Sequence, residues 1–168
     1  MYQSSYEGAE LDKTIRHTLT PDLFGYNASD DVSDTVVIGT VDTYQVIKPA
    51  IAHLDVFMTD EFSYNSTTGG ITYLGSGELY QLIGNVSIDY SVVNTIVHFG
   101  AAVNGVTIFE SSSKLETATA IQSLGLSAYL NLSENDVVTI EVKANKIGTL
   151  EAYHIQGTIT EVKPSLYE

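Results

Sequence analysis

The chain has 168 residues, enough for one domain with a substantial core, and its 7 basic and 21 acidic residues give a net charge of −14 at pH 7. A field of this sign repels phosphate backbones and anionic lipid heads, so neither nucleic acid nor a membrane surface is an expected partner. The absence of cysteine excludes disulfides and thiolate metal sites, while the abundance of Tyr, Thr, Ser, Asn and Gly favours strands and turns over helices.

Residues 7–19 carry the one helical pattern. Leu11, Ile15 and Leu19 fall at i, i+4 and i+8, so they share one narrow apolar stripe. Because so short a helix is marginal alone, the stripe predicts docking, either on a partner or back onto the chain's own β-domain. The first residues lack a basic stretch followed by an apolar run, and export through a signal peptide is not expected.

Residues 20–34 show no sustained hydrophobic period and are interpreted as a linker or ordered loop. Asp30, Asp31 and Asp34 are expected to form a solvated acidic turn, because a calcium loop needs regularly alternating oxygen ligands and a glycine at its bend. This divides the chain into an N-terminal segment, residues 1–34, and a β-domain, residues 35–168.

Strand-like runs follow at residues 35–47, 51–64, 71–74 and 78–93, with turn residues between them. In the last of these runs Leu79, Gln81 and Ile83 share one face. An apparent change of phase at Gly84 and Asn85 predicts a β-bulge there.

The strongest local signal is a β-hairpin. Residues 95–103 and 106–110 are both β-prone and are separated by Asn104-Gly105, which tolerates the positive φ angles of a type I′ turn. Residues 111–123 fit a loop or a short strand equally well. Residues 124–132 and 137–143 alternate with period two, and residues 147–162 supply a final strand or pair, so the chain predicts an antiparallel β-sandwich.

No constellation of catalytic or metal-binding residues is apparent. The histidines are scattered, the serines of residues 111–113 precede Lys114 in a polar stretch, and Glu134 and Asp136 lie at a turn. Asn-x-Ser/Thr sequons are attributed to the Asn-, Ser- and Thr-rich composition. We therefore expect no enzyme, no cofactor and no bound metal. The histidines and the sequon asparagines are His17, His53, His98, His154, Asn27, Asn65, Asn85 and Asn131.

Four strand tyrosines are the candidate interface residues: Tyr80, Tyr90, Tyr129 and Tyr153. Tyrosine combines apolar area with a polar tip, which suits subunit interfaces and sugar-facing surfaces. Packing in the core is an equally good interpretation.

Residues 77–162 resemble the C1q/tumour-necrosis-factor-like jelly roll. The Gly77-Glu-Leu-Tyr80 opening, the strand-turn of Val97 to Gly105, the Leu132 to Val138 step and the Tyr153-His-Ile-Gln-Gly157 step are similar to motifs of that family, although Asn135 stands where the family usually has glycine. The resemblance implies a jelly-roll fold and a homotrimer with one face buried in a threefold interface.

The N-terminal stretch from Tyr6 to Ile15 is similar to a Gly-Ala-Glu-Ile/Leu-Asp leader of bacteriophage head-fibre, decoration and tail-fibre proteins. The resemblance implies a non-enzymatic virion protein, made in the bacterial cytoplasm. It would decorate the capsid or form a short head fibre, attached to the major capsid protein or another virion protein through Leu11, Ile15 and Leu19. The alternative is a receptor- or glycan-binding module that contacts a host surface.

Overall fold

The computed structural model describes residues 23–28, 34–48, 54–115 and 121–162, and these form an all-β structure. Within these ranges no helix occurs, and none could span a membrane. The strands are β1 (Leu23–Ala28), β2 (Asp34–Ile38), β3 (Gln45–Val46), β4 (Leu54–Met58), β5 (Phe62–Asn65), β6 (Gly70–Tyr73), β7 (Glu78–Tyr90), β8 (Thr95–Val103), β9 (Val106–Leu115), β10 (Gln122–Leu132), β11 (Val137–Ala144) and β12 (Gly148–Glu161).

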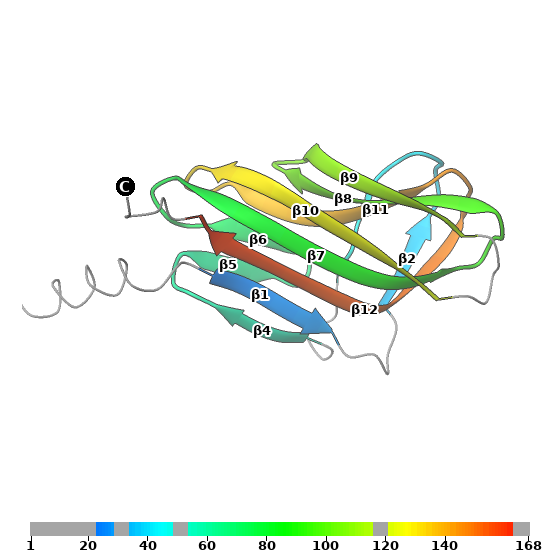
Figure 1. The fold of residues 1–168 in the computed structure, drawn as a ribbon, viewed down its shortest axis with the longest axis horizontal. Coiled ribbons are helices and arrows are strands. Elements are labelled where there is room, and N and C mark those ends of the chain that lie inside the picture. The colour runs from blue at the N-terminus through cyan, green and yellow to red at the C-terminus, as the bar shows by residue number, and fades with distance from the viewer. Residues whose placement is uncertain (1–22, 29–33, 49–53, 116–120, 163–168) are drawn as a thin grey trace, which may run out of the picture.

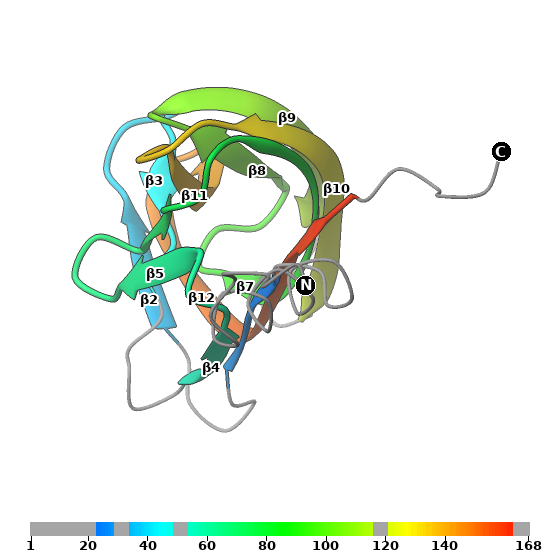
Figure 2. The same cartoon turned by 90° about the vertical axis from the view of Figure 1, so that its left-hand side faces the viewer.

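Two six-stranded antiparallel sheets pack face to face (Figure 1). Sheet A has the order β10-β7-β12-β1-β4, with β2 also paired to β12. Sheet B has the order β5-β6-β11-β8-β9, with β3 also paired to β11. On one side β9 of sheet B lies beside β10 of sheet A, and on the other side lie the short strands β2 and β3 (Figure 2).

The predicted hairpin is confirmed as β8 and β9. Asn104 and Gly105 have φ of 51° and 76°, as the type I′ turn requires. The turn is also tied to sheet B, because the Asn104 amide donates to the Asp136 carboxylate at 2.7 Å and accepts from the Val137 N–H at 3.0 Å. Asp136 also accepts from the backbone N–H of Ser133 at 2.8 Å, and these bonds lower the pKa of its carboxyl.

Alternation along β10 and β11 fills the core as the sequence predicts. In β10 every second side chain from Leu124 to Leu132 is buried. Val138, Ile140 and Val142 of β11 face these side chains from the other sheet.

One end of the core is aromatic. The rings of Phe62, Tyr73 and Tyr80 lie with centroids 5.1–5.4 Å apart in tilted and edge-on arrangements, which are favourable for aromatic pairs. The Tyr73 hydroxyl accepts from the Gly77 N–H at 3.3 Å, so the buried ring keeps a partner for its polar tip.

The sandwich begins earlier than predicted. β1 pairs on one edge with β12, from Leu23 opposite Thr160 to Asn27 opposite Gln156, and on its other edge with β4. The boundary at residue 34 and the linker interpretation of residues 20–34 are therefore wrong for 23–28. The acidic-turn prediction is wrong for Asp34, which begins β2 and pairs with Ala152 of β12. The glycine at position 25 and the nearby aspartates interrupt the hydrophobic period that would have revealed the strand.

Two predicted runs each divide into two strands. Residues 35–47 form β2 in sheet A and β3 in sheet B, joined by a loop in which Asp42 has a φ of 54°. Residues 51–64 include β4 and β5, with a turn closed by the hydrogen bond from the Phe62 N–H to the Thr59 carbonyl. In both runs the chain crosses from sheet A to sheet B at a turn. The sequence does not reveal these turns, because the residues on both sides of them have a high β propensity.

The predicted bulge at Gly84–Asn85 is wrong. β7 pairs with β10 and β12 through that point without a change of register, and Gly84 is buried against Leu126 because it continues the inward series of Tyr80 and Leu82. The bulge lies in β12, where the register shifts between Ala152 and His154.

Candidate functional site

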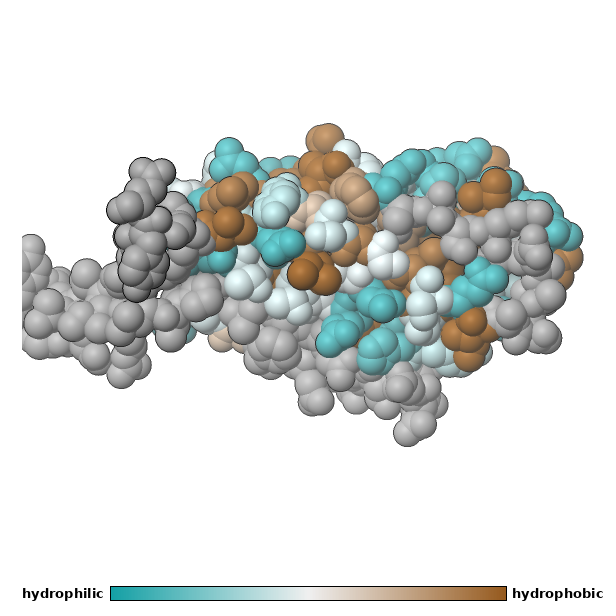
Figure 3. All heavy atoms as spheres, viewed as in Figure 1, coloured by the Kyte–Doolittle hydropathy of each residue, from teal (hydrophilic) through white to brown (hydrophobic). Residues whose placement is uncertain are grey.

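The outer face of sheet A over β7, β10 and β12 carries no charged side chain across most of its length. We call this surface the neutral face; its strands face the viewer in Figure 1, and in the same view Figure 3 shows apolar and polar surface interspersed. The chain has 28 charged residues among 168 (7 basic plus 21 acidic). A continuous surface without charge on such a chain is typical of a surface that contacts another protein. It consists of Leu79, Gln81, Ile83, Asn85, Ser87, Ser123, Gly125, Ser127, Tyr129, Asn131, His154, Gln156, Thr158 and Thr160.

An apolar patch lies within the neutral face. Leu79, Ile83 and Tyr129 are 43%, 54% and 68% exposed. Tyr129 pairs with Gln81, which places its ring diagonally between Leu79 and Ile83, within reach of both. Exposed apolar groups gathered on one uncharged face are typical of a protein–protein contact surface.

Of the four predicted interface tyrosines, Tyr129 and Tyr153 lie on this side of sheet A. Tyr80 and Tyr90 do not, because their side chains are 0% and 1% exposed in the sandwich core. The Tyr90 hydroxyl donates to the Lys146 carbonyl at 2.6 Å, and burial raises the pKa of that phenol. The interface prediction is wrong for these two residues. They lie an even number of positions from Leu82 and Ile88, so the alternation of the strand already places them on the core side.

A second set of exposed apolar side chains lies on the edge strand β9. Val106, Ile108 and Phe109 are all exposed. A register irregularity between Ala101 and Ala102 of β8 leaves Ile108 as the extra residue of β9. This β9 edge is a different surface from the neutral face, although β9 adjoins β10 (Figure 2).

Outside sheet B, a polar cluster ties β9 to the β2–β3 loop. Tyr44 reaches across Gly100, where an added Cβ would lie 3.4 Å from its ring, and its hydroxyl donates to the Glu110 carboxylate. Lys143 of β11 binds the same carboxylate at 3.0 Å and lies 4.4 Å from the centroid of the Tyr44 ring. His98 Nδ1 lies 3.7 Å from Glu110.

The acidic groups of this cluster have different environments. The hydrogen bonds from Tyr44 and Lys143 lower the pKa of Glu110, whereas burial and the Glu110 carboxylate raise the pKa of the Tyr44 phenol. Glu141 is only 6% exposed and accepts from the Thr107 hydroxyl at 2.6 Å; burial raises its pKa. The cluster is an ion-pair and hydrogen-bond network that joins the β2–β3 loop to β8, β9 and β11.

Glu141→Gln is expected to stabilise the protein at pH 7.5 and to have little effect at pH 4. The folded state holds the Glu141 proton more tightly than the unfolded state does, because burial raises the pKa of this carboxyl. Protonated Glu141 therefore contributes to the stability of the fold below the unfolded pKa of about 4.3, and this contribution is lost as the pH rises through the higher folded pKa. Urea unfolding at the two pH values measures the difference, with the exposed turn residue Glu134→Gln as the control. Equal stability of Glu141→Gln and wild type at pH 7.5 would contradict this assignment.

Within the described ranges, no group of three or more His, Asp or Glu residues could hold a metal ion. His98 lies on β8 of sheet B and His154 on β12 of sheet A. Leu11, Ile15, Leu19, Asp30, Asp31, His17 and His53 lie outside the described residues, so the attachment prediction stays a prediction.

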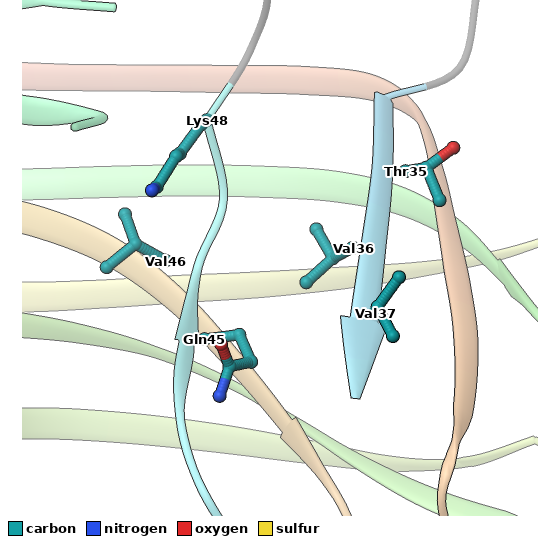
Figure 4. A pocket seen from close by; sticks show the side chains of 6 residues that line it. All are labelled: Thr35, Val36, Val37, Gln45, Val46 and Lys48. Carbon is teal, nitrogen blue, oxygen red and sulfur yellow. The ribbon is translucent and has the colours of Figure 1, made fainter. Parts of the chain in front are cut away.

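The described residues line at least two hollows on the surface. One, of about 220 Å³, lies between β2 and β3 and is lined by Thr35, Val36, Val37, Gln45, Val46 and Lys48 (Figure 4). It is below the range of about 300–1,000 Å³ that small-molecule pockets occupy. The other, of about 380 Å³, lies on sheet A and is lined by Ser87, Ile121, Tyr153 and His154.

No family model matches the chain, and no curated protein matches it. Among solved structures, the chain is similar to the structure of Eiger TNF from S. frugiperda, with 10% sequence identity and a TM-score of 0.56 over 89% of this chain and 99% of that one. A likeness at such low identity concerns the fold alone. The chain therefore folds as an antiparallel TNF-like jelly roll, which confirms the fold predicted from its sequence.

Proposed function

We propose that the chain is a non-enzymatic structural module that assembles as a homotrimer through the neutral face. The observation that carries this proposal is the uncharged surface with its apolar patch of Leu79, Ile83 and Tyr129, on a chain of net charge −14. Copies of so acidic a chain repel one another, and the repulsion is smallest when the contact surface itself carries no charge.

The complementary surface is the β9 edge of a second copy, with Val106, Ile108 and Phe109. Because face and edge are different surfaces, the contact is heterologous, and such contacts form a ring when the rotation between copies closes. A threefold ring fits the TNF-like fold and lets every copy bury both surfaces.

The finer role is decoration of a bacteriophage particle or formation of a short head fibre, with attachment through residues 1–22. It is supported by the similarity of the stretch from Tyr6 to Ile15 to phage virion leaders and by the apolar stripe of Leu11, Ile15 and Leu19. The deletion that tests attachment ends at residue 22, because β1 begins at Leu23.

Ile83→Asp is expected to convert the trimer to a monomer. The new carboxylate would be buried without a partner in each of three interfaces, at about 3–5 kcal/mol each. Multi-angle light scattering at micromolar concentration measures the mass. Ile96→Asp, at an exposed position on β8 of sheet B, is the matched control and should remain trimeric. A monomeric wild type, or equal masses for the two variants, would overturn the proposal.

A further inference from the structure

The hollow of about 380 Å³ on sheet A occupies a different part of the neutral face from the apolar patch. We call it the bulge hollow; it is lined by Ser87, Ile121, Tyr153 and His154. Ser87 follows Ile83 by four residues on β7, which separates the two sites by about 13 Å along the strand. A ligand in the hollow therefore leaves the apolar patch of Leu79, Ile83 and Tyr129 uncovered.

The β12 bulge builds this hollow. Ala152 and Ile155 are both buried, so the extra residue places the side chains of Tyr153 and His154, which lie between them, on the outer side of the sheet together. Regular alternation would have turned one of them into the core. Bulges that re-aim side chains in this way are common beside functional sites.

The lining combines four kinds of group: a phenol ring, an imidazole, a hydroxyl and an aliphatic side chain. The Ser87 hydroxyl is positioned by the Ser123 hydroxyl at 3.2 Å. None of the four described lining residues is an acid, a lysine or an arginine. The volume lies at the lower end of the range for small-molecule pockets, which suits one compact polar ligand.

We propose that the bulge hollow binds a neutral monosaccharide unit of a glycan. A pyranose presents an apolar face, which stacks on an aromatic ring, and a rim of hydroxyl groups, which exchange hydrogen bonds with imidazole and serine. The net charge of −14 selects against anionic sugars. The acidic residues Asp89 and Glu151, opposite each other in the next row of the sheet, add acceptors for sugar hydroxyls at the border.

Saturation-transfer NMR on the full chain tests this with glucose, galactose, mannose and N-acetylglucosamine as probes. We expect at least one sugar to receive saturation, and we expect Tyr153→Ala and His154→Ala each to weaken its binding by about tenfold or more. Ser87→Ala, the mildest change, should weaken binding without loss of fold. His98→Ala, a half-buried histidine on sheet B, is the matched control and should bind like wild type, with thermal unfolding confirming that each variant is folded.

The Ile83→Asp variant is measured beside wild type, so that a hollow covered by assembly would still be seen. Transfer to none of the four sugars in either protein would overturn the proposal, as would losses in His98→Ala equal to those in His154→Ala. Light scattering on the same samples reports assembly independently, so failure of sugar binding is distinguishable from failure of the trimer.

Discussion

Deleting residues 1–22 is expected to leave a folded jelly roll that no longer binds particles lacking the native protein, whereas deleting residues 1–34 is expected to abolish cooperative folding. β1 pairs along both edges, with β12 and with β4. Its removal exposes the β12 edge and detaches β4 from sheet A, and unpaired inner edges are both unstable and prone to aggregate. For a domain whose whole stability is of order 5–15 kcal/mol, the loss of a strand paired on both sides is decisive.

Thermal unfolding followed by circular dichroism separates the two truncations, and co-sedimentation with depleted particles tests attachment of the shorter deletion. The intact chain is the control in both measurements. Equal unfolding temperatures for the two truncations would show that β1 contributes little. Undiminished particle binding after loss of residues 1–22 would move attachment to the sandwich.

Tyr80→Ala is expected to cost about 3–5 kcal/mol of stability, whereas Tyr129→Ala is expected to weaken assembly with little change in the stability of the monomer. Tyr80 is fully buried and packs edge-on against both Phe62 and Tyr73 at centroid distances of 5.1–5.4 Å. Its truncation leaves a cavity between the sheets. Tyr129 projects outward from β10 and is 68% exposed, so in the proposed assembly its truncation removes mainly contact area with a second copy.

Urea unfolding and light scattering on the two variants should show opposite effects. Tyr80→Ala should lower the unfolding midpoint, and Tyr129→Ala should lower the association constant. If Tyr129→Ala proved as destabilising as Tyr80→Ala when both were monomeric, the ring of Tyr129 would be a core group, contrary to its exposure.

How far the sequence predicts this fold depends on how local each determinant is. The β8–β9 hairpin was predictable because Asn104-Gly105 encodes its own turn, and β10 because five alternating apolar side chains define one face. β1 was missed because its stability comes from pairing with β12, more than 120 positions away in the chain. Pairing with a distant strand produces no recognisable hydrophobic period within the six residues of β1.

The alternation of buried and exposed side chains along a strand predicts burial when the whole strand is considered. Tyr80 and Tyr90 share even positions with Leu82 and Ile88, so their burial was encoded, and the apparent slip at Gly84 came from a small residue in the inward series. The change of register lies in β12, between Ala152 and His154.

Clusters built across strands were not predictable. Tyr44, Glu110 and Lys143 come from a loop and two strands separated by tens of residues, and only register brings them together. The neutral face combines three strands in the same way. Each strand alone reads as an ordinary polar alternation, and the absence of charge becomes meaningful only after β7, β10 and β12 are placed side by side.

The position of β12 also governs the order in which the molecule can form. Its residues 148–161 lie between β7 on one edge and β1 and β2 on the other, so the two earliest strands of sheet A pair directly with the latest. Sheet B needs no part of β12 and can assemble around the β8–β9 hairpin during synthesis. Sheet A is complete only when residues 148–161 are available to pair, and until then the apolar side chains of β7 and β10 have only sheet B for cover.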